Sequence, residues 1–143
     1  MPAPSRAPKI KIISVLVAED LRQEVNGQQT IVGVFGWQLN STSSAFVLPR
    51  VVVRIDFTSD ASGPFNASFS VVSPNGSVVF TPPQTVSVNV KSDQINTFAM
   101  GWGPAKFAES GQYEIKFGIA GRESRVATLQ VNTNVGQPRP QPG

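Results

Sequence analysis

Apolar and polar residues alternate with a period of two along most of the chain. In segment 51–58, Val53, Ile55 and Phe57 fall on one side of an extended backbone and Arg54 falls on the other. The same alternation recurs in segments 65–71, 85–91, 112–119 and 127–131. Successive side chains of a β-strand point to opposite faces, so this pattern predicts strands with one buried and one exposed face.

Turn residues separate the predicted strands at short intervals. Asn26-Gly27 lies between segments 21–25 and 28–35 and is a strong hairpin signal. Weaker strands at 9–18 and 95–102 bring the count to about nine, and no segment has a convincing helical period. Short strands at this spacing are typical of a sandwich or a barrel, so we expect an all-β fold.

Segment 109–115, with the sequence ESGQYEI, resembles the tyrosine corner of immunoglobulin-like domains. In that motif the tyrosine precedes a disulfide cysteine by two residues, and Ile115 occupies the corresponding position here. The resemblance implies an immunoglobulin-like antiparallel β-sandwich of about seven to nine strands. We expect one domain over residues 9–134, between flexible proline-rich tails at 1–8 and 135–143.

The opening segment 13–35 resembles that of a small, uncharacterised bacterial family. The matching residues are the Ala-Glu-Asp at 18–20, a turn glycine at 27 and the Gly-Val-Phe at 33–35. The resemblance implies a bacterial or phage origin and an immunoglobulin-like fold. It implies no activity, because none is established for that family.

The composition narrows the chemistry that the chain can perform. It has neither cysteine nor histidine, which removes disulfides, thiolate nucleophiles, histidine-based triads and the usual zinc ligands. We therefore expect a protein that is not an enzyme and holds no cofactor. The net charge of +3 comes from 12 cations and 9 anions that form no cluster, so we expect no nucleic-acid partner.

Segment 12–18 superficially resembles a signal peptide, because it is apolar and follows basic residues. Its apolar run is short, and Glu19 and Asp20 follow it without a cleavage site of small residues, so we interpret it as a buried first strand. No apolar stretch reaches the roughly 18 residues of a membrane span. We expect a cytoplasmic protein, or one incorporated in a particle assembled there, with no membrane partner.

Glu19, Asp20 and Arg22 form the most unusual local feature of the sequence. With a two-residue loop at Asn26-Gly27, Asp20 faces Gly33. Two adjacent acids in an apolar hairpin are costly unless they are paired or solvated. They are interpreted either as a site for a cation or a basic partner, or as surface charges turned outward by a bulge at Gly33 and paired with Arg22 or Arg54.

Two further groups of residues have more than one interpretation. Trp37, Trp102 and Phe107 lie near predicted strand ends, and they either form an apolar binding platform or cap the core. Three aspartates, at 56, 60 and 93, have the ligand type of a calcium site, although no local motif supports one.

Taken together, the sequence favours a non-catalytic module that binds a protein partner or assembles through edge strands, loops and tails. A homo-oligomer or a component of a larger particle, such as a virion, fits this expectation. The alternative is a carbohydrate- or ligand-binding module that uses Trp37 and Trp102. The third interpretation is a carboxylate and metal enzyme that uses Glu19 and Asp20.

Overall fold

The computed structural model describes residues 7–134 as an all-β protein without a helix in that range. Its strands are β1 (Ile10–Gln23), β2 (Gln29–Phe35), β3 (Gln38–Asn40), β4 (Phe46–Leu48), β5 (Val51–Ser59), β6 (Gly63–Val72), β7 (Val78–Phe80), β8 (Val86–Val90), β9 (Asn96–Trp102), β10 (Ala105–Phe107), β11 (Gly111–Ile119) and β12 (Arg122–Asn132). None of these residues lies in a helix able to cross a membrane.

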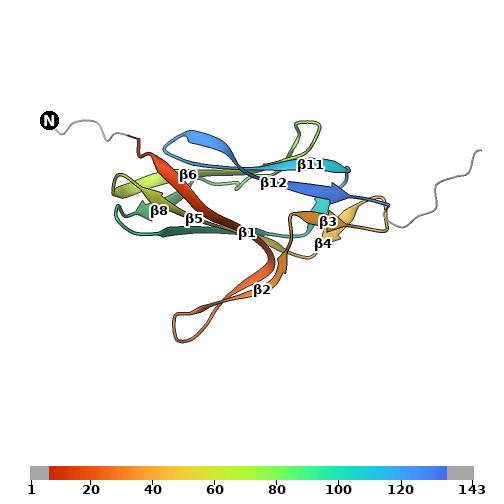
Figure 1. Cartoon of the computed structure of the whole chain (residues 1–143), viewed down its shortest axis with the longest axis horizontal. Helices are drawn as coiled ribbons and strands as arrows, with labels where there is room; N and C mark the ends of the chain where they lie inside the picture. Colours follow the sequence, from red (N-terminus) through yellow and green to blue (C-terminus); the bar gives the residue numbers. More distant parts are fainter. Residues whose placement is uncertain (1–6, 135–143) are drawn as a thin grey trace, which may run out of the picture.

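The strands form two main sheets that face one another (Figure 1). The first sheet has the order β2-β1-β5-β9 and is antiparallel throughout. The second has the order β3-β12-β11-β6-β7, with β8 paired to the first half of β6. A separate two-stranded sheet joins β4 and β10. The predicted all-β sandwich is confirmed.

Two details of the predicted sandwich are wrong. The described chain has twelve strands rather than about nine, because β3, β4 and β10 have three residues each and are too short for alternation to reveal them. In addition, β3 pairs with β12 in parallel, so the second sheet is mixed at that edge rather than wholly antiparallel.

The core lies between the two main sheets and is built on phenylalanine. The Phe117 ring of β11 lies 5.4 Å from Phe57 of β5 and 4.9 Å from Phe98 of β9, and Phe69 of β6 lies 5.7 Å from Phe98. These pairs join the two sheets, because β5 and β9 belong to one sheet and β6 and β11 to the other. The alternating residues of the sequence therefore line a common interior.

The predicted tyrosine corner is present at the start of β11. The Tyr113 hydroxyl donates a hydrogen bond to the Glu109 carbonyl over 2.9 Å and accepts one from the Glu109 amide over 3.1 Å. Burial raises the pKa of Tyr113, and the nearby Glu109 charge acts in the same direction. Ile115 is buried, so apolar packing occupies the position of the disulfide cysteine.

The folded part begins close to the expected boundary. Pro8, which the sequence assigned to the first tail, is buried. Ala7 of the same tail is half-buried, and residues 1–6 and 135–143 of the predicted tails lie outside the described part of the chain.

Strand β1 extends beyond the end of β5, the strand with which its first half pairs. From Ile10 to Ala18 it pairs with β5, and the last pair of that ladder is Ala18 with Val52. From Val17 to Gln23 it pairs with β2. The second half of β1 therefore continues with β2 as a hairpin that projects from the sandwich (Figure 1).

Candidate functional site

The turn of the projecting hairpin lies where the sequence predicts it but contains three residues instead of two. The Gly27 amide donates to the Glu24 carbonyl over 3.0 Å, and the Glu24 amide donates to the Gln28 carbonyl over 2.7 Å. Gly27 has a φ of 85°. This is the arrangement of a turn followed by a glycine bulge, which adds one residue to the loop.

The longer loop shifts the hairpin register by one residue, so the predicted register is wrong. Asp20 pairs with Val32, and Ala18 pairs with Val34. A shift of one residue exchanges the two faces of a strand. As a result Glu19, rather than Asp20, lies over Gly33.

Gly33 makes room for the Glu19 side chain. Its φ is 65°, and a Cβ atom at this position would lie 2.7 Å from Glu19 Cδ. Glu19 and Gly33 do not pair in the ladder between β1 and β2, but the pairs before and after them keep the same register. The expected irregularity at Gly33 is therefore present as an omitted pair and not as an added residue.

Asp20 connects the hairpin to the body of the sandwich. Its carboxylate lies 3.1 Å from Arg50 Nε and 3.5 Å from Arg22 Nε, and it accepts a hydrogen bond from the Leu21 amide over 2.9 Å. The expected pairing with Arg22 is found, whereas Arg54 instead contacts Asp56. All of these groups are partly solvated, so each ion pair contributes at most about 1 kcal/mol.

A cleft of about 320 Å³ lies at the root of the hairpin. Three of the predicted site residues line it together with residues of the β4–β5 connection, and the lining consists of Glu19, Asp20, Arg22, Val32, Leu48, Pro49 and Arg50. The structure therefore brings the acidic pair and Arg22 together. Within residues 7–134 no three acids are grouped so that they could hold a metal ion, so the structure does not bring the aspartates at 56, 60 and 93 together.

The three aromatic residues with two open interpretations differ in their exposure. Trp37 is 45% exposed, but Trp102 is half-buried and stacks on Phe80 with ring centroids 4.7 Å apart. Phe107 is buried against Tyr113 at 5.2 Å. The interpretation as core capping is therefore correct for Phe107, which is not accessible to a ligand.

Strand β2 presents an uncovered edge. It pairs with β1 alone, and no other described strand lies on its outer side. Hydrogen-bonded and non-hydrogen-bonded pairs alternate in an antiparallel ladder, and Glu24 with Gln28 forms a hydrogen-bonded pair. The backbone groups of Gln29 and Ile31 consequently point away from β1, toward solvent.

The side chains of β2 are also poorly covered. No charged residue or proline occurs between Gln28 and Phe35. Val34 is 56% exposed, and Val25 at the tip is fully exposed. A long, uncharged edge strand with exposed apolar residues is a template for pairing with another chain.

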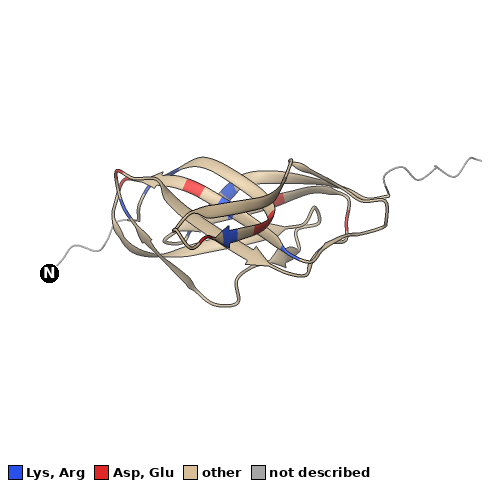
Figure 2. Ribbon diagram, turned by 90° about the horizontal axis from the view of Figure 1, so that it is seen from below, with Lys and Arg blue, Asp and Glu red and all other residues tan. Residues whose placement is uncertain are grey.

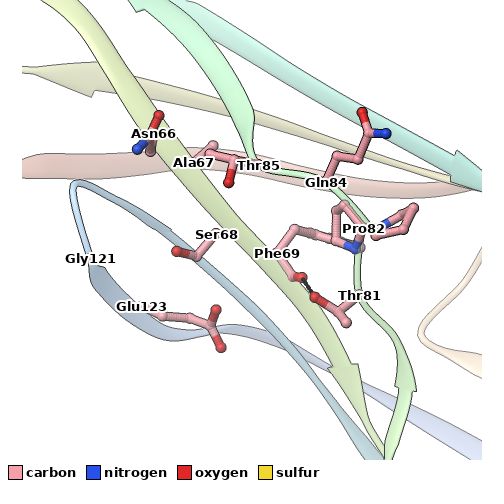
Figure 3. Close-up of a pocket in the computed structure, with 11 residues that line it drawn as sticks. Asn66, Ala67, Ser68, Phe69, Thr81, Pro82, Gln84, Thr85, Gly121 and Glu123 are labelled. Carbon is pink, nitrogen blue, oxygen red and sulfur yellow. Dashed lines mark hydrogen bonds between the residues drawn. The ribbon is translucent and has the colours of Figure 1, made fainter.

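A larger cleft, of about 550 Å³, was not indicated by the sequence. It lies between β6 and the segment 81–85, and Glu123 of β12 borders it (Figure 3). Thr81 donates a hydrogen bond to the Phe69 carbonyl over 3.0 Å and holds the segment against β6. The residues that form this cleft meet only through the pairing of distant strands, so no local motif could have revealed them.

The charged residues of the described chain are few, and basic and acidic positions lie on the same strands and turns (Figure 2). On the exposed face of the first sheet, Asp56 accepts hydrogen bonds from Thr97 over 2.6 Å and from Ser14 over 3.1 Å, and it pairs with Arg54 at 3.3 Å. Burial raises the pKa of Asp56, but these hydrogen bonds and the Arg54 charge outweigh it. The net effect lowers the pKa below its ordinary value.

A protein-family model matches most of the chain. The model of a family of unknown function, DUF6941, matches residues 13–132. The chain belongs to this family. No curated protein matches the chain.

Two of the solved structures with some similarity belong to a much longer protein. Two crystal structures of a β-glucosidase from Listeria innocua, one with isofagomine and one with glucose, are 14% and 13% identical to the DUF6941 chain. Each match covers 87% of this chain with a TM-score of 0.40. The chain spans only 16% of the length of these enzymes.

Proposed function

We propose that this protein is a non-catalytic module that binds another protein chain through the outer edge of β2. The observation that carries the proposal is the uncovered edge of β2 on a hairpin that projects from the sandwich. Addition of a strand to an exposed edge is a general mode of protein recognition, in which backbone hydrogen bonds supply affinity.

The other edges of the molecule are less suited to this role. In the second sheet, β3 and β7 have three residues each and β8 has five. Short edge strands are one way in which proteins limit edge-to-edge association. In the first sheet, β9 has the same length as β2, but its Phe98 is buried in the core. The edge of β12 before Gln130 is also unpaired, but it carries Arg122, Glu123 and Arg125, and charged edge residues disfavour pairing with another chain. Among the described strands, β2 therefore combines a long edge without charged side chains with distance from the core.

The proposal also includes the absence of catalysis and the cellular location of the protein. A chain without cysteine or histidine is suited to binding rather than to proton transfer or metal chemistry. We place the protein in the cytoplasm of a bacterium or in a phage particle assembled there, as a component of a larger structure. The alternative ligand-binding module receives less support, because Trp37 is exposed alone while Trp102 stacks on Phe80.

The proposal is tested by a proline in the outer edge. Ile31→Pro removes an amide that points away from β1, so it blocks strand addition without removing a hydrogen bond of the hairpin. Ile31→Ala is the matched control, because it removes the same side chain and keeps the amide. Size-exclusion chromatography of extracts from cells that produce each variant then reports the size of the complexes.

We expect the wild-type protein and Ile31→Ala to elute well ahead of the 15.3 kDa monomer, and Ile31→Pro to elute as a monomer. Circular dichroism and thermal melting of the purified variants establish that each one is folded. Elution of the wild-type protein as a monomer in every extract would contradict the proposal. Equal elution of the wild-type protein and a folded Ile31→Pro variant would also contradict it.

A further inference from the structure

The outer edge of β2 is self-complementary. Gln29 and Ile31 both direct their backbone donors and acceptors outward, and Thr30 lies between them. A two-fold axis through Thr30, perpendicular to the sheet, places Gln29 of one copy opposite Ile31 of another. The outward amide and carbonyl of Gln29 in each copy then lie opposite the outward carbonyl and amide of Ile31 in the other copy. An isologous antiparallel pair requires this reciprocal match.

The regular part of the strand fixes the position of this axis. Gly33, with its φ of 65°, interrupts the ladder, so the straight segment of the edge runs from Gln28 to Val32. Thr30 is the centre of that segment. An axis at Val32 would require the second copy to pair with the irregular backbone at Gly33.

The side chains along the segment are compatible with a second copy. The residues from Gln28 to Val32 carry no charge of their own, but the Glu24 carboxylate accepts a hydrogen bond from the Thr30 hydroxyl over 2.7 Å. Arg54 donates a hydrogen bond to the Gln29 side-chain oxygen over 3.2 Å, and Arg22 lies on the neighbouring strand opposite Thr30. The counterpart of Arg22 in the second copy would be three strand spacings away, about 14 Å, which exceeds the screening length of about 8 Å at physiological ionic strength.

From these observations we infer that two copies of this chain pair through β2, antiparallel and centred on Thr30, to form one sheet with four strands from each copy. The inference rests on the proposed function and names a second copy of the chain as the partner. Pairing turns the hairpin tip, where Val25 is fully exposed, toward the end of β2 in the other copy. Thr30 meets Thr30 at the axis, where each hydroxyl donates its hydrogen bond to Glu24 of its own chain.

The absence of cysteine from the chain allows a direct test with single cysteines. In this register Thr30 faces its own counterpart in a non-hydrogen-bonded pair, where the Cα atoms lie about 4.5 Å apart. That distance suits a disulfide. Val47→Cys is the control, because Val47 is 58% exposed on β4 and reports random collision.

The full chain, purified, is oxidised mildly and examined on a non-reducing gel. We expect Thr30→Cys to form disulfide dimers at least about tenfold faster than Val47→Cys, because pairing raises the effective concentration of the thiols. Val32→Cys alone should dimerise slowly. Mixed with Gln28→Cys, it should form the heterodimer quickly, since these two residues face each other in the proposed register.

Equal rates for Thr30→Cys and Val47→Cys, with light scattering that gives a monomer at high concentration, would overturn the inference. Dimerisation that is fastest for Val32→Cys alone would overturn the register centred on Thr30. The proposed function is judged separately by the extracts. If the purified chain is monomeric while the wild-type protein still elutes in large complexes that Ile31→Pro abolishes, then the partner of β2 is a different protein.

Discussion

Strands β2 and β9 are the two edges of the same four-stranded sheet, and each has seven residues. In β9, Phe98 is buried and contacts Phe69 and Phe117 of the opposite sheet. In β2, only Phe35 packs against the core, and the other residues are half-buried or exposed.

The difference comes from what faces each strand. The inner side of β9 lies over the second sheet, whereas β2 pairs with a part of β1 that has already passed the end of β5. The body of the protein is therefore stabilised by burial between two sheets, and the hairpin by a two-stranded ladder and a few partly solvated charges. A two-stranded hairpin alone is marginal in water, so the projecting part is suited to being stabilised by a partner.

The largest expected effect is a difference in the free energy of unfolding that is lost when a side chain is truncated in β9 and in β2. Phe98→Ala in β9 removes a buried ring and should lower the free energy of unfolding by about 3–5 kcal/mol. Ile31→Ala in β2 should lower it by less than about 1 kcal/mol, because Ile31 is only half-buried. Denaturant unfolding of both variants measures the contrast. Similar losses for the two variants would show that the hairpin is as tightly packed as the body.

A smaller effect is expected at the tyrosine corner, which fixes the body at the start of β11. Tyr113→Phe keeps the buried ring and removes the hydroxyl that bonds both the amide and the carbonyl of Glu109. The expected loss is about 1–2 kcal/mol by thermal or denaturant unfolding. Because the corner is distant from β2, the dimerisation of Thr30→Cys should be unchanged in this background, and a change would indicate coupling between the two regions.

Acid should weaken the body through Asp56. The pKa of Asp56 in the folded protein lies below its ordinary value, so the carboxylate contributes stability at pH values above its unfolded pKa of about 4. This contribution is lost as the pH falls from there through the folded pKa. Thermal melts between pH 6 and pH 2.5 should show a smaller acid-induced decrease for Asp56→Asn than for the wild-type protein. An identical decrease would mean that Asp56 is not perturbed.

The smallest effect on global stability is expected at the root of the hairpin. Asp20→Ala removes the contacts with Arg50 and Arg22, and it should change the free energy of unfolding by less than about 1 kcal/mol. Its effect should be confined to the hairpin. The amides of Leu21 and Thr30 should exchange faster with solvent, and the exchange of the amides in β9 should not change. Arg125→Ala, which breaks the ion pair with Glu114 in the second sheet, is the control that should leave the hairpin amides unaffected.

The sequence predicts the strands well and the environment of each strand poorly. Alternation in segments 51–58 and 112–119 identifies β5 and β11, because both strands have one face in the core. The same reasoning identifies β2, yet it cannot show that no sheet lies opposite that strand. Phe107 illustrates the converse limit, since a short strand next to a glycine and a proline buries it completely.

The hairpin shows why part of the site could be predicted and part could not. Asn26-Gly27 places the turn correctly, but the sequence does not distinguish a two-residue loop from a three-residue loop with a bulge. That single residue decides whether Asp20 or Glu19 lies over Gly33. The Arg50 partner of Asp20 lies 30 positions away and is set by the tertiary pairing of β1 with β5, which no local motif encodes.

Amide hydrogen exchange along β2 tests the central claim most directly, because neighbouring residues of one strand serve as controls for each other. In a dilute solution, the amides of Gln29 and Ile31 should exchange quickly, while those of Thr30 and Val32, which face β1, should be protected. At high concentration, or in complex with the partner, Gln29 and Ile31 should become protected as well. If these outward amides still exchange quickly in the assembled protein, the edge of β2 is not the contact and the account is wrong.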